Sequence, residues 1–269
     1  MTVSDSGFLQ IGEQNLEYRM IGPRANAAPT LVMLHEGLGC VGLWGDFPEK
    51  LQKATGCGVF VFSRAGYGQS SPVKLPRPLT YMHDEARDVL PAVLDAIGFR
   101  RGLLLGHSDG ASIAALYAGT HQDHRVGGLV LIAPHFFTED IGIASIAQAR
   151  RAYESGELRQ KLARWHKDVD NAFYGWNDAW LDLDFRQWDI TDALGYIRVP
   201  ILIVQGEEDQ YGTTKQIEVA ERDCYCPVEV ALIPGAGHSP HRDTPEPTLK
   251  AIAEFVADVL RVNEWEKAA

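Results

Sequence analysis

The chain has 269 residues, of which 45% are hydrophobic and 23% charged, a balance that is ordinary for a globular protein with a sizeable core. Its 25 basic and 36 acidic residues give a formal net charge of −11, so polyanionic partners such as nucleic acid and anionic membrane surfaces are not expected. The composition also excludes collagen, coiled-coil, disulfide-scaffold and membrane-spanning classes.

The first predicted elements are β-strands. Two segments of alternating polarity, residues 8–11 and 16–21, predict an antiparallel hairpin. Short apolar runs follow, each bounded by Gly, Pro or polar residues, which is typical of strands buried on both faces of a parallel sheet. These runs span residues 30–35, 59–63, 102–106, 129–133, 201–205 and 228–233.

Helices are predicted between the strands. Over residues 82–97 apolar side chains recur every three or four positions, with Thr80 expected to cap the start and Gly98 the end. Pro91 lies inside this pattern and should kink or break the helix. Apolar side chains recur in the same way over residues 249–259, which predicts a second helix. The alternation predicts an α/β fold, with a mostly parallel central sheet and helices on both of its faces.

One long interval interrupts the alternation of strands and helices. Residues 135–199 contain no convincing strand and hold four of the six tryptophans. Over residues 158–176, apolar side chains recur at helical intervals. We therefore predict a helical cap at 135–199, inserted into a core made of residues 1–134 and 200–269. Most of its aromatic side chains should pack the cap onto the sheet, whereas Phe136, Trp176 and Trp180 are candidates for the wall of a substrate pocket.

The pattern that carries chemistry lies at residues 106–110, which read Gly-His-Ser-Asp-Gly. This is a G-x-S-x-G sequence between an apolar strand and a helix of small residues. Such a turn holds the serine in a strained conformation with its hydroxyl exposed, and the glycines avoid clashes. Ser108 is therefore a candidate nucleophile. His107 precedes it in the turn, and we expect this histidine to have no chemical role.

A serine nucleophile needs a base, and the base needs an acid that orients it. Asp209 follows the strand at 201–205, and His238 follows the strand at 228–233. Since the carboxyl ends of parallel strands lie at one edge of a sheet, these side chains should meet Ser108 there. Two alternatives stay open: Glu207 or Glu208 as the acid, and His241 as the base.

With these residues the chain resembles the α/β-hydrolase superfamily, in its serine branch with a helical cap, from Phe8 to about Leu260. The resemblance implies Ser108 as nucleophile, Asp209 as acid and His238 as general base. It also implies an oxyanion hole formed by the backbone N–H groups of Asp109 and Gly37, with Glu36 as the competitor for the second position.

Two positions depart from the family pattern. Glu36 stands where the superfamily usually has Gly after His35, and Ser63 stands where Asp is usual. If the Glu36 carboxylate faces the cleft, it disfavours anionic substrates and could act as a second acid or base; otherwise it turns away into a hydrogen-bonded or solvated position. Acidic residues near the site favour a neutral or cationic substrate.

These residues point to a serine hydrolase that cleaves an ester, lactone or thioester of a small apolar or aromatic molecule through an acyl-enzyme. One alternative is a carbon–carbon bond hydrolase of ring-fission diketones, although no basic residue could be assigned to the carboxylate of such substrates. Another is a ligand-binding member of the fold without turnover. Neither a metal nor a cofactor is implied.

The expected cellular location and binding partners are inferred from signals that the sequence does not contain. The N-terminus shows no basic segment followed by an apolar one, so no secretory signal is expected. The four cysteines, at positions 40, 57, 224 and 226, do not have zinc-site spacing. We expect a cytoplasmic protein with free thiols whose partner is a small-molecule substrate. Its oligomeric state stays open, a homodimer included.

Overall fold

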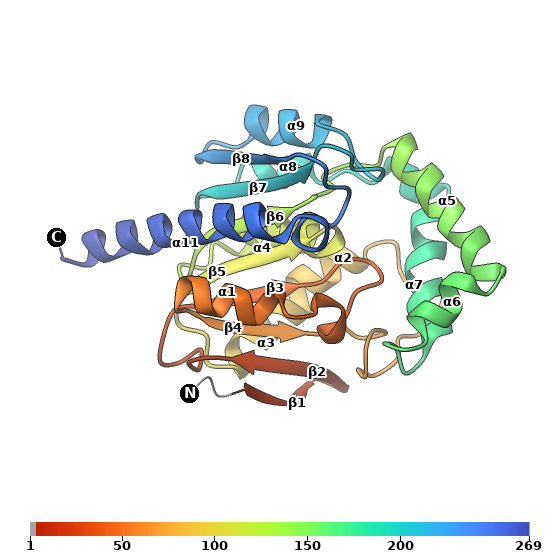
Figure 1. The fold of residues 1–269 in the computed structure, drawn as a ribbon, viewed down its shortest axis with the longest axis horizontal. Helices are drawn as coiled ribbons and strands as arrows, with labels where there is room; N and C mark the ends of the chain where they lie inside the picture. Colours follow the sequence, from red (N-terminus) through yellow and green to blue (C-terminus); the bar gives the residue numbers. More distant parts are fainter. Residues whose placement is uncertain (1–3, 269) are drawn as a thin grey trace.

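A computed structural model describes residues 4–268 of the chain. Its centre is an eight-stranded sheet with the strand order β1-β2-β4-β3-β5-β6-β7-β8 (Figure 1). β1 and β2 form the predicted antiparallel hairpin, β2 pairs antiparallel with β4, and the remaining strands are parallel. The predicted α/β class is therefore confirmed. The strands are β1 (Ser4–Ile11), β2 (Gln14–Ile21), β3 (Thr30–Leu34), β4 (Gly58–Phe62), β5 (Gly102–His107), β6 (Val126–Ile132), β7 (Ile201–Gly206) and β8 (Val228–Ile233).

The predicted strand positions agree closely with the observed ones. The largest difference inside the parallel sheet is at β6, which begins at Val126 rather than at residue 129. Gly127 and Gly128 interrupt the apolar run there, although Val126 and Gly128 still pair with β5, on either side of a register shift at Gly127. The apolar pattern therefore detects only the part of the strand that carries apolar side chains.

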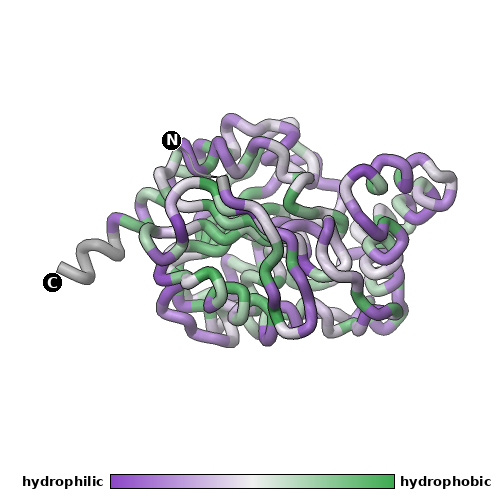
Figure 2. The backbone as a smooth tube through the Cα atoms, turned by 90° about the horizontal axis from the view of Figure 1, so that it is seen from below, coloured by the Kyte–Doolittle hydropathy of each residue, from purple (hydrophilic) through white to green (hydrophobic). Residues whose placement is uncertain are grey.

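Both faces of the sheet are covered by helices. Along β3, Leu31 and Met33 point to one face, where α1 (Phe47–Thr55) packs beside α11 (Pro245–Ala268). Val32 and Leu34 point to the other face, which is covered by α4 (Asp109–His121) and its neighbours. Because both faces are buried, the strands are continuous apolar runs. Figure 2 shows these hydrophobic strands at the centre of the molecule, between more hydrophilic outer segments.

The predicted helix at 82–97 is present but divided. α2 (Tyr81–Asp84) continues into a π-helical turn, η2 (Glu85–Val89), and then into α3 (Leu90–Ala96). The wide turn lies directly before Pro91, which lacks an N–H group and crowds the preceding turn. Gly98 ends the helix with a φ of 66°. Thr80 stands at the start, but its hydroxyl donates to the Asp84 carboxylate (2.8 Å), so the predicted capping bond is not formed.

The long interval between β6 and β7 is helical. α5 (Asp140–Glu154), α6 (Glu157–Leu162) and α7 (Val169–Leu181) arch over the carboxyl ends of the strands (Figure 1). The short η3 (Asp184–Gln187) follows. α8 (Thr191–Leu194) packs against α4 and α9 (Lys215–Asp223), and thus on the body of the protein. From here on, the cap means α5 to α7. Within residues 4–268, no helix has the length and hydrophobicity that crossing a membrane requires.

Candidate active site

The nucleophile turn joins β5 to α4. Ser108 lies between them with φ 53° and ψ −117°, a left-handed conformation that non-glycine residues rarely adopt. A methyl group on Gly106 would collide with the main chain of Gly110, and one on Gly110 would collide with the main chain of Leu34. Only glycine fits at both positions. The turn therefore presents the Ser108 side chain at the N-terminus of α4.

The predicted base and acid lie together beside this turn. Nδ1 of His238 is 2.9 Å from each carboxylate oxygen of Asp209. Asp209 also accepts hydrogen bonds from Gln205 Nε2 (2.7 Å) and the amide of Tyr211 (2.7 Å). Burial alone would raise the pKa of Asp209, but the hydrogen bond and charge of His238 lower it below its usual value. An ionised Asp209 holds the proton on Nδ1, which leaves Nε2 of His238 free to accept one.

The alternative acids and base occupy other places. Glu207 and Glu208 are exposed and lie outside the cavity of Ser108. His241 is buried with its ring 4.9 Å from that of Trp44, and burial lowers its pKa well below the usual value. Neither arrangement provides the carboxylate–imidazole contact that Asp209 and His238 make.

A cavity of about 450 Å³ is lined by the candidate nucleophile and base, with Asp209 behind His238 and outside the lining. Ser108, His238, Gly37 and Asp109 all line it, at the carboxyl ends of the parallel strands. No hydrogen bond joins the Ser108 hydroxyl to the His238 ring, although both groups face this cavity. Its apolar wall comes mostly from the cap and the loop after β3, in the side chains of Leu38, Leu43, Ile146, Leu158, Leu162, Trp165, Trp176 and Trp180.

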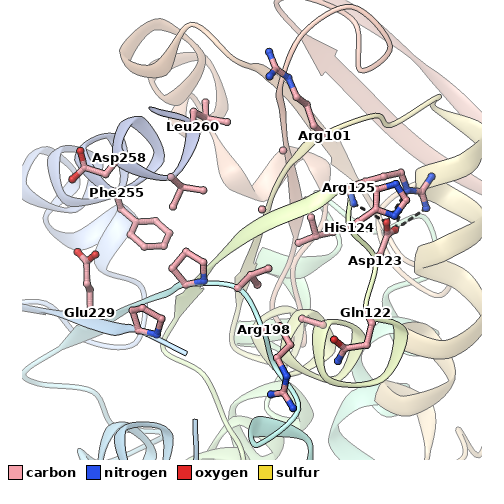
Figure 3. A pocket seen from close by; sticks show the side chains of 18 residues that line it. Arg101, Gln122, Asp123, His124, Arg125, Arg198, Glu229, Phe255, Asp258 and Leu260 are labelled. Atoms are coloured by element: carbon pink, nitrogen blue, oxygen red, sulfur yellow. Dashed lines mark hydrogen bonds and ion pairs between the residues drawn. The ribbon is translucent and has the colours of Figure 1, made fainter. Parts of the chain in front are cut away.

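A larger groove of about 780 Å³ lies at the opposite end of the sheet, where β5 to β8 begin (Figure 3). Its rim is charged, and Asp123 and Arg125 are paired with each other there at 2.7 Å. None of the candidate catalytic residues lines it. Since ligands of open parallel sheets bind at the carboxyl ends of the strands, the smaller cavity is the candidate active site.

The cap contacts both residues of the predicted oxyanion hole. The Trp176 indole lies so close to Gly37 that a methyl group there would be well inside 3.0 Å of it. Trp180 Nε1 donates to the Asp109 carboxylate (3.2 Å) and to the Tyr81 hydroxyl (3.0 Å). Tyr81 itself donates to Asp109 (2.6 Å). The Asp109 carboxylate is therefore engaged by side chains, and its backbone N–H stands at the start of α4.

Three of the four pocket residues expected from the sequence, Glu36, Trp176 and Trp180, line the cavity. Phe136 does not, because its side chain is fully buried in the hydrophobic core. The neighbouring His135 lines the cavity instead, with its ring 5.5 Å from that of His238.

Sequence reasoning missed several residues of the cavity. His135 is one of them: burial, followed by the charge of His238, lowers its pKa to about 3, so its ring is neutral near pH 7. Tyr211 is another, with its ring 4.7 Å from that of His238. Two basic side chains also line the cavity: Lys161, which is paired with Glu157 at 2.7 Å, and Arg242, which lies 4.0 Å from the Glu36 carboxylate. The position of His135 directly after a strand end was the one available signal, because such positions collect at this edge of the sheet.

Three acidic side chains near the site have partners. Glu36 Oε2 lies 3.4 Å from His107 Nδ1. Burial alone would raise the pKa of Glu36, but the adjacent His107 ring outweighs burial and holds the pKa well below its usual range. Asp109 and Asp209 are also engaged, whereas Glu207 and Glu208 are exposed outside the cavity. The acidic side chains on which the expectation of a neutral or cationic substrate rests therefore do not stand free in the cavity.

The second departure, Ser63, is compensated by a side chain from another strand. The Ser63 hydroxyl donates to the Glu17 carboxylate (2.8 Å) and accepts from the amide of Val41 (2.9 Å). The amide of Gln69 donates to the same carboxylate (3.0 Å). Glu17, on β2, thus brings a carboxylate to the turn where the family usually has Asp.

Comparison with known proteins places the chain in a family. The family described as "Alpha/beta hydrolase family" matches residues 31–251. A 2-hydroxy-6-oxononadienedioate/2-hydroxy-6-oxononatrienedioate hydrolase of Pseudomonas putida is 32% identical over 242 residues, which cover 77% of this chain and 81% of that protein. A proline iminopeptidase of Lactobacillus helveticus is 22% identical over 259 residues, covering 82% and 87%. The crystal structure of an enol-lactonase from Burkholderia xenovorans superposes with a TM-score of 0.71 at 17% identity, covering 95% of this chain and all of that one, which supports the fold alone.

Proposed function

Because the chain belongs to the α/β hydrolase family, we propose that it is a serine hydrolase that cleaves an ester, lactone or thioester bond through Ser108, His238 and Asp209. The observation that carries the proposal is the 2.9 Å contact of Asp209 with His238, whose ring lines the same cavity as the strained Ser108. A strained serine, an oriented imidazole and an ionised carboxylate are the parts that acyl transfer needs.

The mechanism follows from the places of these groups. Nε2 of His238 accepts the proton of Ser108 as Oγ attacks the carbonyl carbon of the substrate. The negative charge that develops on the carbonyl oxygen accepts hydrogen bonds from the N–H groups of Gly37 and Asp109, the second aided by the N-terminus of α4. His238 then returns the proton to the leaving oxygen or sulfur. A water molecule activated by the same histidine releases the acid and restores Ser108.

The cavity wall supports a small apolar or aromatic substrate. Three cap tryptophans, Trp165, Trp176 and Trp180, face it together with leucines from the cap and from the loop after β3. A volume of about 450 Å³ lies within the range of small-molecule sites. The flat apolar surfaces favour an aryl or short acyl group beside the scissile bond.

A second candidate is a carbon–carbon bond hydrolase of a ring-fission diketone that carries a carboxylate. Lys161 and Arg242 line the cavity and offer the basic side chains that the sequence left unassigned. Glu36 is engaged by His107 and opposes such a substrate less than a free carboxylate would. The relative of 32% identity is named for a substrate of the dioate class, which also favours this candidate.

A substrate panel separates the two candidates. It contains aryl esters of increasing acyl length, a small lactone and a vinylogous 1,5-diketone, each assayed with the wild type and with Ser108→Ala. Under the ester proposal, ester or lactone turnover falls at least about a thousandfold in Ser108→Ala. Turnover of the diketone alone would favour the second candidate. Turnover of none of the panel by folded protein, or ester turnover unchanged in Ser108→Ala, would contradict the proposal.

A further inference from the structure

One buried histidine joins the nucleophile turn to the oxyanion loop and to the segment that carries the base. His107 is fully buried, and its Nε2 lies 2.7 Å from the backbone carbonyl oxygen of His238. Its Nδ1 lies 3.4 Å from Oε2 of Glu36. His107 directly precedes Ser108, and Glu36 directly precedes Gly37. We call this arrangement of Glu36, His107 and the His238 carbonyl the His107 bridge.

One proton of the bridge is fixed by its partner. A carbonyl oxygen only accepts hydrogen bonds, so Nε2 of His107 carries a hydrogen and donates it to His238. The opposite nitrogen, Nδ1, has no hydrogen-bond partner among the described residues and faces the Glu36 carboxylate at 3.4 Å. The carboxylate therefore lies on the side of the ring opposite the donor, and the donor is directed at the His238 carbonyl.

The His107 donor is one of the contacts that hold the main chain around His238. His238 follows the sequence Gly235-Ala236-Gly237, and Gly235 has a φ of 69°. Beyond β8, the Ala236 carbonyl accepts from the amide of Glu208 (2.9 Å), and the amide of Gly237 donates to Asp243 (3.0 Å). The His107 bridge is the contact made by His238 itself to the nucleophile turn. The Asp209 contact orients the His238 ring, whereas the bridge fixes the carbonyl of the same residue. Both the ring and the backbone carbonyl of His238 are thereby held in place, the carbonyl directly against the nucleophile turn.

We propose that Glu36 and His107 are positioning residues that hold the main chain of His238 against the nucleophile turn and the oxyanion loop. The inference rests on the proposed function, because it assigns His238 the role of base. It also explains why a carboxylate is present at position 36, where the superfamily usually has glycine. The competing explanation is that His107 only fills space, since its ring lies 4.9 Å from that of His241 and 6.2 Å from that of Trp44.

Two substitutions of His107 separate donation from space filling. His107→Phe keeps an aromatic ring and removes the donor, whereas His107→Gln loses the ring and keeps an N–H donor at the reach of Nε2. His121→Phe is the matched control, because His121 Nε2 also meets a backbone carbonyl, that of Arg87 (3.2 Å), but on the surface away from the cavity. Each variant is assayed for the rate of labelling by a fluorophosphonate and for kcat and KM on an aryl ester.

Donation predicts a specific order of rates. His107→Phe should lower the labelling rate and kcat by about 10- to 100-fold with KM nearly unchanged, the effect of a base displaced by a fraction of an ångström to about one. His107→Gln should recover most of that loss, and His121→Phe should behave as the wild type. Equal rates in His107→Phe and the wild type would overturn the proposal, and so would equal losses in the Phe and Gln variants.

Cooperative thermal unfolding checks that the His107 variants are folded. A second pair of variants, at Glu36, tests the same proposal without changing His107. Glu36→Leu removes the partner of Nδ1 and should lower the labelling rate about tenfold, whereas Glu36→Gln, whose amide still meets Nδ1, should recover most of it. A wild-type rate in Glu36→Leu would overturn the role of Glu36. If the wild type itself is not labelled at Ser108, the proposed function fails; if it is labelled and the variants match it, only this inference fails.

Discussion

Replacement of Gly37 by alanine should disable the enzyme through a contact with the cap. The new methyl group would lie well inside 3.0 Å of Nε1 and Cδ1 of Trp176, a separation that real Cβ atoms essentially never show. The indole is nearly buried on α7 and packs edge-on against Phe173 at 6.1 Å. It has little room to rotate away, so the oxyanion loop or the cap has to move.

The size of the effect follows from what has to move. Separating the methyl group from the indole requires a shift of about 1 Å, which displaces the Gly37 amide from the oxyanion. We expect kcat to fall about 100-fold, because loss of one oxyanion donor costs about 10²- to 10³-fold. The free energy of unfolding should fall by about 1–3 kcal/mol, the usual cost of overpacking.

Steady-state kinetics on an aryl ester and urea unfolding measure the two effects. Gly212→Ala is the matched control, because its methyl group would lie 3.4 Å from His135, an ordinary van der Waals contact. In a double-mutant cycle, Gly37→Ala should cost much less kcat in a Trp176→Leu background than in the wild type. A kcat unchanged by Gly37→Ala, or the same loss in both backgrounds, would refute the reasoning.

Three further predictions concern groups around the site. His135 has a pKa of about 3 in the folded protein against 6.5 in the unfolded chain, so the unfolded state binds more protons between these values and stability falls as the pH falls. The free energy of unfolding, measured with urea, should therefore fall between pH 7 and pH 5 by up to about 2 kcal/mol more in the wild type than in His135→Gln. Equal decreases in the two proteins would contradict the lowered pKa of His135. Trp180→Phe removes a donor from the buried Asp109 carboxylate and should cost about 1–3 kcal/mol of unfolding free energy, whereas Trp165→Phe, at a cap position that is 41% exposed, should change it by less than about 0.5 kcal/mol. Glu17→Ala leaves the Ser63 hydroxyl and a turn amide without their acceptor and should lower the free energy of unfolding by about 1–2 kcal/mol in the same assay; an unchanged free energy of unfolding would contradict the role given to Glu17.

The sheet and the nucleophile turn could be predicted because their signals are local. Strands buried on both faces are continuous apolar runs, and the Gly-His-Ser-Asp-Gly turn lies where such a run meets a helix of small residues. At Gly127 and Gly128, which carry no apolar side chains, the predicted strand was shorter than the observed β6. At Pro91 the sequence indicated a disturbance but not its form, because a widened turn relieved the crowding without ending the helix.

The lining of the cavity could not be predicted in the same way, since loops have no period that tells inside from outside. Phe136 and His135 are neighbours after β6, and the more hydrophobic of the two enters the core while the other faces the cavity. Lys161 reaches the cavity from α6 only because the cap docks over the sheet, and Arg242 reaches it from α10 (Pro240–Asp243), a short helix that follows His238. Likewise, the charge of Glu36 could not be assigned without the buried His107, which is distant in sequence.

The nucleophile itself can be identified by mass spectrometry. Folded protein is incubated with a fluorophosphonate, and the intact mass and the modified peptide are determined for the wild type, Ser108→Ala and His238→Ala. We expect one adduct per chain, mapped to Ser108, absent from Ser108→Ala and formed far more slowly in His238→Ala. An adduct on another residue, or labelling of Ser108→Ala at the wild-type rate, would contradict the assignment of Ser108 as the nucleophile.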